Sequence, residues 1–92
     1  MPDDVELAEA VYAVSDEAFA LAQAVAVGGE ADAQRAGQLA ERAAELGPAA
    51  RDSLDGSLRQ ILSETQVDLN YALNGGRAPM SLRLGQILRD QR

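Results

Sequence analysis

A regular apolar repeat runs through residues 4–27, DVELAEAVYAVSDEAFALAQAVAV. Its main row, spaced 4-3-4-3-4, consists of Leu7, Val11, Val14, Ala18, Leu21 and Val25. Because side chains three and four positions apart share one face of an α-helix, this spacing predicts a long helix with an apolar seam. The clearly polar stripe is narrow and consists of Glu6, Glu9, Asp16 and Gln23. We therefore expect this helix to contact more than one neighbour and to organise the fold.

Glycine and proline divide the rest of the chain at Gly28-Gly29, Gly47-Pro48 and Asn74-Gly75-Gly76, with Pro79 just beyond. Glycine and asparagine favour helix ends, and proline favours the first turn of a helix. No segment alternates with a period of two, so no strand is predicted. The sequence predicts an all-α fold, a small up-down bundle of three main helices plus a shorter C-terminal helix. The single domain covers residues 1–92, with helices at about residues 4–27, 31–46, 49–73 and 79–90.

Several details of these helices follow from local signals. The second helix starts at Glu30 or Asp32, and its apolar row contains only Ala36, Leu39, Ala43 and Leu46. The third follows Pro48 and has a broad leucine face that includes Leu54; in an alternative, Ser53 or Asp55 is its N-cap and residues 48–54 form a separate turn. Both tyrosines, Tyr12 and Tyr71, are expected to be partly buried in the core.

The composition excludes much of the usual chemistry of active sites. The 92 residues include no Cys, His, Trp or Lys, and all eight basic residues are Arg. The commonest general base and the preferred zinc ligands are therefore absent. Glu41 and Glu45 lie one helical turn apart and resemble a paired-carboxylate site, but a solvated face beside arginine explains them better. We predict no catalytic residue, no cofactor and no metal site, and hence no enzyme.

The apolar content is modest for a chain that folds alone. Eighteen of the apolar residues are alanine, and between Gly28 and Ser53 only Leu39 and Leu46 are larger. Small domains with limited cores often gain stability by associating with another chain. The acidic N-terminus and the interrupted apolar run predict a cytoplasmic protein without a membrane segment. Lys-free, Ala- and Arg-rich usage is typical of a GC-rich bacterial genome.

Charge is distributed unevenly along a chain whose net charge is −7. Residues 1–34 contain eight acids and no base, whereas residues 69–92 contain four Arg and one Asp. Segments of opposite charge attract each other. We therefore expect Arg83 and Arg89 to meet the acidic first helix, within one chain or across a dimer. An acidic chain with so few basic residues is not expected to bind nucleic acid directly.

The tripeptide Asp52-Ser53-Leu54 resembles the phosphopantetheine attachment site of acyl carrier proteins. The resemblance implies that Ser53 carries the prosthetic group at a helix N-terminus, where backbone amides favour a phosphate. The sequence departs from carriers in three ways: a helix replaces their long loop before the serine, Gly56 interrupts the following helix, and the C-terminal half differs. An N-cap role for Ser53 is the simpler interpretation.

The function that this pattern favours is a non-enzymatic protein–protein interaction module, such as a small adaptor, regulatory or accessory subunit. The predicted contact residues are on the C-terminal helix and comprise Leu82, Arg83, Leu84, Ile87, Leu88 and Arg89. We also expect a homo-oligomer, with self-association through Leu7, Val11, Val14, Leu21 and Val25 or, alternatively, through the leucine faces of the third and fourth helices. The alternatives are a carrier protein modified at Ser53 and a helical sensor with an apolar ligand pocket.

Overall fold

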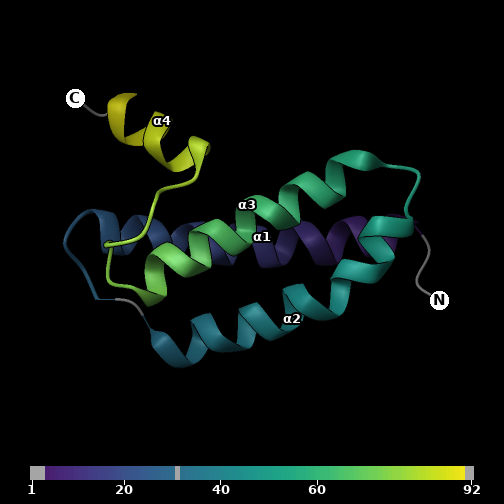
Figure 1. Cartoon of the computed structure of the whole chain (residues 1–92), viewed down its shortest axis with the longest axis horizontal. Coiled ribbons are helices and arrows are strands. Elements are labelled where there is room, and N and C mark those ends of the chain that lie inside the picture. Colours follow the sequence, from purple (N-terminus) through teal and green to yellow (C-terminus); the bar gives the residue numbers. More distant parts are fainter. Residues whose placement is uncertain (1–3, 31, 91–92) are drawn as a thin grey trace.

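Three long helices pack side by side, and a short fourth helix lies across one end of them (Figure 1). The computed structural model describes residues 4–30 and 32–90. The helices are α1 (Asp4–Ala26), α2 (Ala33–Asp52), α3 (Gly56–Leu73) and α4 (Leu82–Asp90). In Figure 1, α1 and α3 run in one direction and α2 runs in the other. The predicted all-α bundle of three main helices and a shorter C-terminal helix is confirmed.

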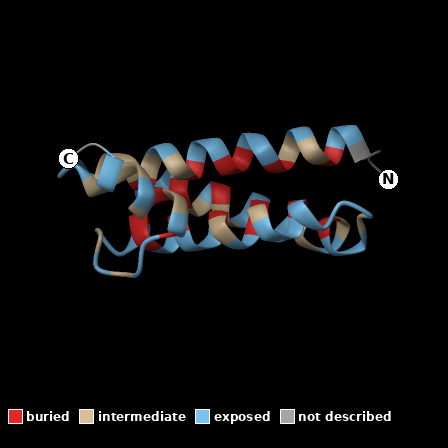
Figure 2. Ribbon diagram, turned by 90° about the horizontal axis from the view of Figure 1, so that it is seen from above, coloured by how far each residue is buried: buried red, intermediate tan, exposed pale blue. Residues whose placement is uncertain are grey.

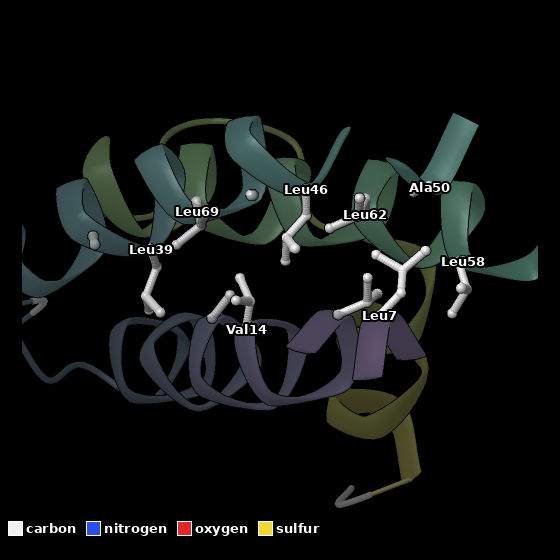
Figure 3. Packing of buried hydrophobic residues seen from close by; sticks show 12 residues of the cluster. Leu7, Val14, Leu39, Leu46, Ala50, Leu58, Leu62 and Leu69 are labelled. Carbon is white, nitrogen blue, oxygen red and sulfur yellow. The ribbon is translucent and has the colours of Figure 1, made fainter. Parts of the chain in front are cut away.

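The core is formed by one row of side chains from each long helix (Figures 2 and 3). Helix α1 contributes Leu7, Val11, Val14 and Ala18. Helix α2 contributes Ala36, Leu39, Ala43, Leu46 and Ala50, and α3 contributes Leu58, Leu62 and Leu69. The repeat in residues 4–27 thus packs between two neighbours, as its wide apolar circumference predicts. Burial of these side chains in a close-packed interior stabilises the arrangement.

Helix α2 continues through Gly47 and Pro48, so the predicted break after Leu46 is wrong. Proline removes one backbone hydrogen bond, to the carbonyl four residues earlier, which belongs to Ala44. Both Pro48 and Ala44 are exposed, so water can solvate that carbonyl. Continuing the helix also adds Ala50, only 2% exposed, to the buried row. Burial of this last turn therefore outweighs the local helix-breaking signal.

Replacing Pro48 with alanine should stabilise the protein by about 2 kcal/mol. A proline inside a helix costs about 3 kcal/mol relative to alanine, partly offset by the greater freedom that alanine gives the unfolded chain. Urea unfolding of wild type and Pro48→Ala measures the difference. An unchanged or lower midpoint would mean that α2 does not continue as a helix beyond Gly47.

The remaining boundaries agree with the predicted ones only in part: α2 follows Asp32, one of the two predicted starts, and the others differ. The side chain of Asp32 caps α2 by accepting from the Arg35 N–H at 3.0 Å. Ser53 is the C-cap of α2 rather than an N-cap, and residues 48–52 belong to α2 rather than to a separate turn. Leu54 is 98% exposed in the loop and not on the leucine face. Helix α4 begins at Leu82 instead of Pro79, because the Ser81 hydroxyl caps it by accepting from the Leu84 N–H at 3.2 Å.

Asp55 is the N-cap of α3, one of the two residues that the sequence offered. Its Oδ1 accepts from the Ser57 hydroxyl at 2.5 Å and from the Ser57 backbone N–H at 3.0 Å. Both bonds favour the charged carboxylate, so they hold the pKa of Asp55 below its usual value of 3.8, with the hydroxyl bond the larger cause. A carboxyl with a lowered pKa stabilises the fold above its unfolded pKa, and this contribution disappears as the pH falls through the folded pKa.

The Ser57→Ala substitution should raise the pKa of Asp55 towards 3.8, because it removes the larger of the two causes. Carboxyl chemical shifts followed by NMR during an acid titration measure this. Ser53→Ala is the matched control, since Ser53 Oγ accepts from the Asp55 backbone N–H and does not touch its carboxylate. Equal pKa values of Asp55 in wild type and Ser57→Ala would contradict the described cap.

Candidate interaction surfaces

Helix α4 docks on its own chain through a second, smaller apolar cluster. Its buried members are Ala22 of α1, Tyr71 of α3 and Leu84 of α4. The partly buried side chains Phe19, Val25, Ala26 and Leu88 pack around them. The chain reaches this position through Gly76, whose φ of 86° suits glycine and where an added Cβ would lie 3.3 Å from the Tyr71 hydroxyl. The Leu84 face of α4 is therefore occupied within the protomer.

An arginine fixes α4 against both α1 and α3. Arg83 donates to Asp68 Oδ2 from Nη2 at 2.6 Å and from Nε at 3.1 Å. It also donates from Nη1 to the Ser15 hydroxyl at 2.8 Å and from Nη2 to the Ser15 carbonyl at 3.2 Å. Its Cζ lies 4.6 Å from the centre of the Phe19 ring, within cation–π distance. One guanidinium thus joins three helices.

Burial makes this ion pair different from a surface pair. The Asp68 side chain is fully buried and that of Arg83 is 28% exposed. A buried carboxylate is costly unless a cation and hydrogen bonds compensate it. Oδ2 receives both bonds from Arg83, while Oδ1 has no hydrogen-bond partner among the described residues. The pair therefore specifies where α4 sits, since any other position leaves Asp68 without its cation.

We expected the acidic partner of Arg83 on the first helix, but this partner, Asp68, lies on α3. The described part of α1 meets Arg83 through the neutral Ser15 and through Phe19. Arg89 donates from Nε to the Gly85 carbonyl of its own helix at 3.3 Å, and among the described residues it makes no hydrogen bond to α1. The sequence did contain an indication that Asp68 is the partner. Asp68 interrupts the apolar face of α3, and an acid on such a face requires a cation.

The other predicted contact residues of α4 are divided between inside and outside. Leu84 is fully buried, Ile87 and Leu88 are half-buried, and Arg89 is exposed. Leu82 is 81% exposed, as its position off the apolar row predicts. Met80, just before the helix, is 43% exposed. The start of α4 therefore presents apolar side chains to solvent while the rest of the helix is docked.

The seam predicted for self-association is covered within the chain. Leu7, Val11 and Val14 are buried, and Leu21 and Val25 are half-buried. Of the two tyrosines, Tyr71 is buried as expected, but Tyr12 is 47% exposed and the core prediction for it is wrong. Tyr12 lies on the opposite side of α1 from the seam, in a row with the exposed Glu9 and Asp16.

The carboxylate and serine candidates occupy ordinary surface positions. Glu45 pairs with Arg42 at 3.2 Å on the exposed face of α2, and Glu41 is exposed beside them. Ser53 precedes Asp55, whose carboxylate already caps the helix that would receive a phosphate at Ser53. Glu17 of the acidic first helix pairs with Arg35 of α2, with Arg35 Nε 2.7 Å from Glu17 Oε2.

None of the described helices combines the length and hydropathy that crossing a bilayer requires.

Two grooves run along the outside of the bundle. One lies between α1 and α2 and is bordered by Arg35 and Arg42, both paired with glutamates. The other lies between α2 and α3, has a volume of about 220 Å³, and is bordered by Arg51 and Arg59. Among the described residues, neither of these two arginines has a carboxylate within 4.0 Å. The sequence did not predict this groove, because the predicted helix break at Gly47 falls in the middle of the wall that α2 provides.

No protein-family model, curated protein or solved structure matches the chain.

Proposed function

We propose that this chain is a non-enzymatic protein–protein interaction module that contacts its partner through the exposed start of α4. The observation that carries the proposal is Leu82, a large apolar side chain that is 81% exposed on a helix otherwise docked by Leu84 and Arg83. Met80 extends the same apolar segment along the chain. Large apolar side chains that fill a partner's pocket dominate the affinity of many interfaces.

The ion pair beneath α4 supports this role. Binding costs less free energy when the contact residue is held in place beforehand. Arg83 joins α4 to α1 and α3, so the backbone that carries Leu82 is fixed before a partner arrives. The module would act as an adaptor or accessory subunit, with specificity set by side chains around Leu82.

Replacing Leu82 with serine should remove partner binding without affecting the fold. The tagged chain is purified from the organism that encodes it, and co-purifying proteins are quantified by mass spectrometry. We expect Leu82→Ser to recover the partner about tenfold less than wild type, since loss of one buried anchor costs 1–2 kcal/mol or more. Thermal unfolding should change little, because surface substitutions usually alter stability by under about 0.5 kcal/mol.

Leu54→Ser is the matched control, because Leu54 is 98% exposed on the loop between α2 and α3 and has the same chemistry. It should recover the partner as wild type does. If Leu82→Ser recovered as much partner as wild type, the start of α4 would be excluded as the contact surface. Recovery of no specific protein by the wild-type chain would contradict the proposed function itself.

A further inference from the structure

The groove between α2 and α3 has an apolar floor and charged borders. Ala43 and Ala50 of α2 and Leu62 of α3 are buried and form the floor, and Gly47 lies between the two alanines. A Cβ built on Gly47 would meet nothing within 4 Å, so the groove is open above it. Arg51 and Arg59 border the floor from the two helices, and Ser63 and Gln66 complete the lining on α3. Such a groove accepts a helix face that carries acids as well as apolar side chains.

The borders differ in charge from those of the groove between α1 and α2. There, both arginines are neutralised by glutamates of the same chain. Arg51 and Arg59 are exposed and lack such partners among the described residues, in a chain whose net charge is −7. Two unpaired cations beside an apolar floor attract an anionic ligand surface, and a partner with matched acids is favoured over a basic one.

The chain itself carries a helical face with this chemistry. Val5, Glu9, Tyr12 and Asp16 are spaced 4-3-4 on the outer side of α1. Val5 is 66% and Tyr12 47% exposed, and Glu9 and Asp16 are exposed without an ion-pair partner among the described residues. Large apolar side chains alternate here with two acids on one face of a helix. Such a mixed row of apolar and acidic side chains complements a groove with an apolar floor and basic borders.

We propose that the outer face of α1 from a second copy of this chain binds in the α2–α3 groove, with Glu9 and Asp16 against Arg51 and Arg59. The proposal rests on the proposed function in giving the chain a binding role, but it uses a different surface from α4. The docking face lies on the exposed side of α1, away from the groove between α2 and α3, so one molecule cannot offer both surfaces to the same partner copy and the contact is heterologous. Repetition of a heterologous contact produces rings or open filaments rather than a closed two-fold dimer.

Reversing the charges of the groove and of the docking face, first separately and then together, tests the contact directly. Light scattering over a dilution series should show that the average mass of wild type rises with concentration. Arg51→Glu/Arg59→Glu and Glu9→Arg/Asp16→Arg should each weaken association by about tenfold or more, because like charges then face each other. An equimolar mixture of the two variants should associate again, since each groove then meets a helix of opposite charge. Salt at about 1 M should weaken the wild-type contact through screening.

Arg42→Glu/Arg77→Glu is the control, because it makes the same change in net charge at exposed positions outside the groove. It should associate like wild type. All the substituted side chains are exposed, so each variant should fold. Circular dichroism of each variant checks this. The proposal is overturned if wild type stays monomeric up to about 1 mM, or if the groove variant associates like wild type. Neither result affects partner recovery through Leu82, which separates failure of this inference from failure of the proposed function.

Discussion

Replacing Arg83 with methionine should lower the free energy of unfolding by about 3 kcal/mol, since removing one member of a buried ion pair leaves the other charge without compensation. Methionine keeps much of the apolar stem of arginine, so the loss reports the guanidinium and not its packing. The fully buried Asp68 would lose the cation that donates both of its hydrogen bonds. Urea unfolding, followed by circular dichroism, measures the effect.

The Asp68→Leu/Arg83→Met double variant provides the control. Apolar residues of similar shape can replace a buried ion pair with little loss, or even a gain, in stability. We therefore expect the double variant to be markedly more stable than Arg83→Met alone. A loss of under about 0.5 kcal/mol in Arg83→Met would indicate an ordinary solvated surface pair and would contradict the buried arrangement.

Leu58→Ala should destabilise the bundle by about 3 kcal/mol. Leu58 is 1% exposed at the start of α3 and packs in the main core with residues of α1 and α2. Truncating a buried leucine loses its transfer free energy and leaves a cavity that neighbours fill incompletely. The shift in the midpoint of urea unfolding gives the value.

Leu54→Ala makes the same chemical change four residues earlier. Leu54 is 98% exposed, so its truncation should change stability by under about 0.5 kcal/mol. The sequence placed both leucines on one face of one helix, whereas the structure places only Leu58 there. Similar losses in the two variants would show that α3 begins before Leu54 and would favour the sequence-based boundary.

The apolar repeats of the long helices were sufficient to predict the architecture. The seam of α1 and the leucines of α3 have enough large side chains at helical spacing to identify both elements. The break at Gly47-Pro48 was predicted wrongly because local propensity was given more weight than Ala50, which extends the buried row by one turn. Boundaries set by a side-chain cap, such as Ser81 for α4, depend on one hydrogen bond and are correspondingly hard to locate.

The candidate surfaces were less predictable than the fold. The sequence indicated that Arg83 meets an acid, but Asp68 is fifteen positions away and becomes its partner only once α3 and α4 are packed. The exposure of Leu82 follows from its position off the apolar row, which is a local property, whereas its role as a contact residue stays a prediction. The α2–α3 groove depends on two helices meeting beside Gly47, so periodicity within either helix does not reveal it.

The bundle is closed by its own α4, which leaves outer side chains such as Leu82 free for the proposed partner. NMR on an equal mixture of ¹³C-labelled and unlabelled protein tests this closure, because filtered nuclear Overhauser spectra separate contacts within a molecule from contacts between molecules. We predict that Leu84 methyl groups contact the Tyr71 ring only within one molecule, at every protein concentration. Contacts between Leu84 of one molecule and Tyr71 of another would show that α4 is exchanged between copies and would contradict it.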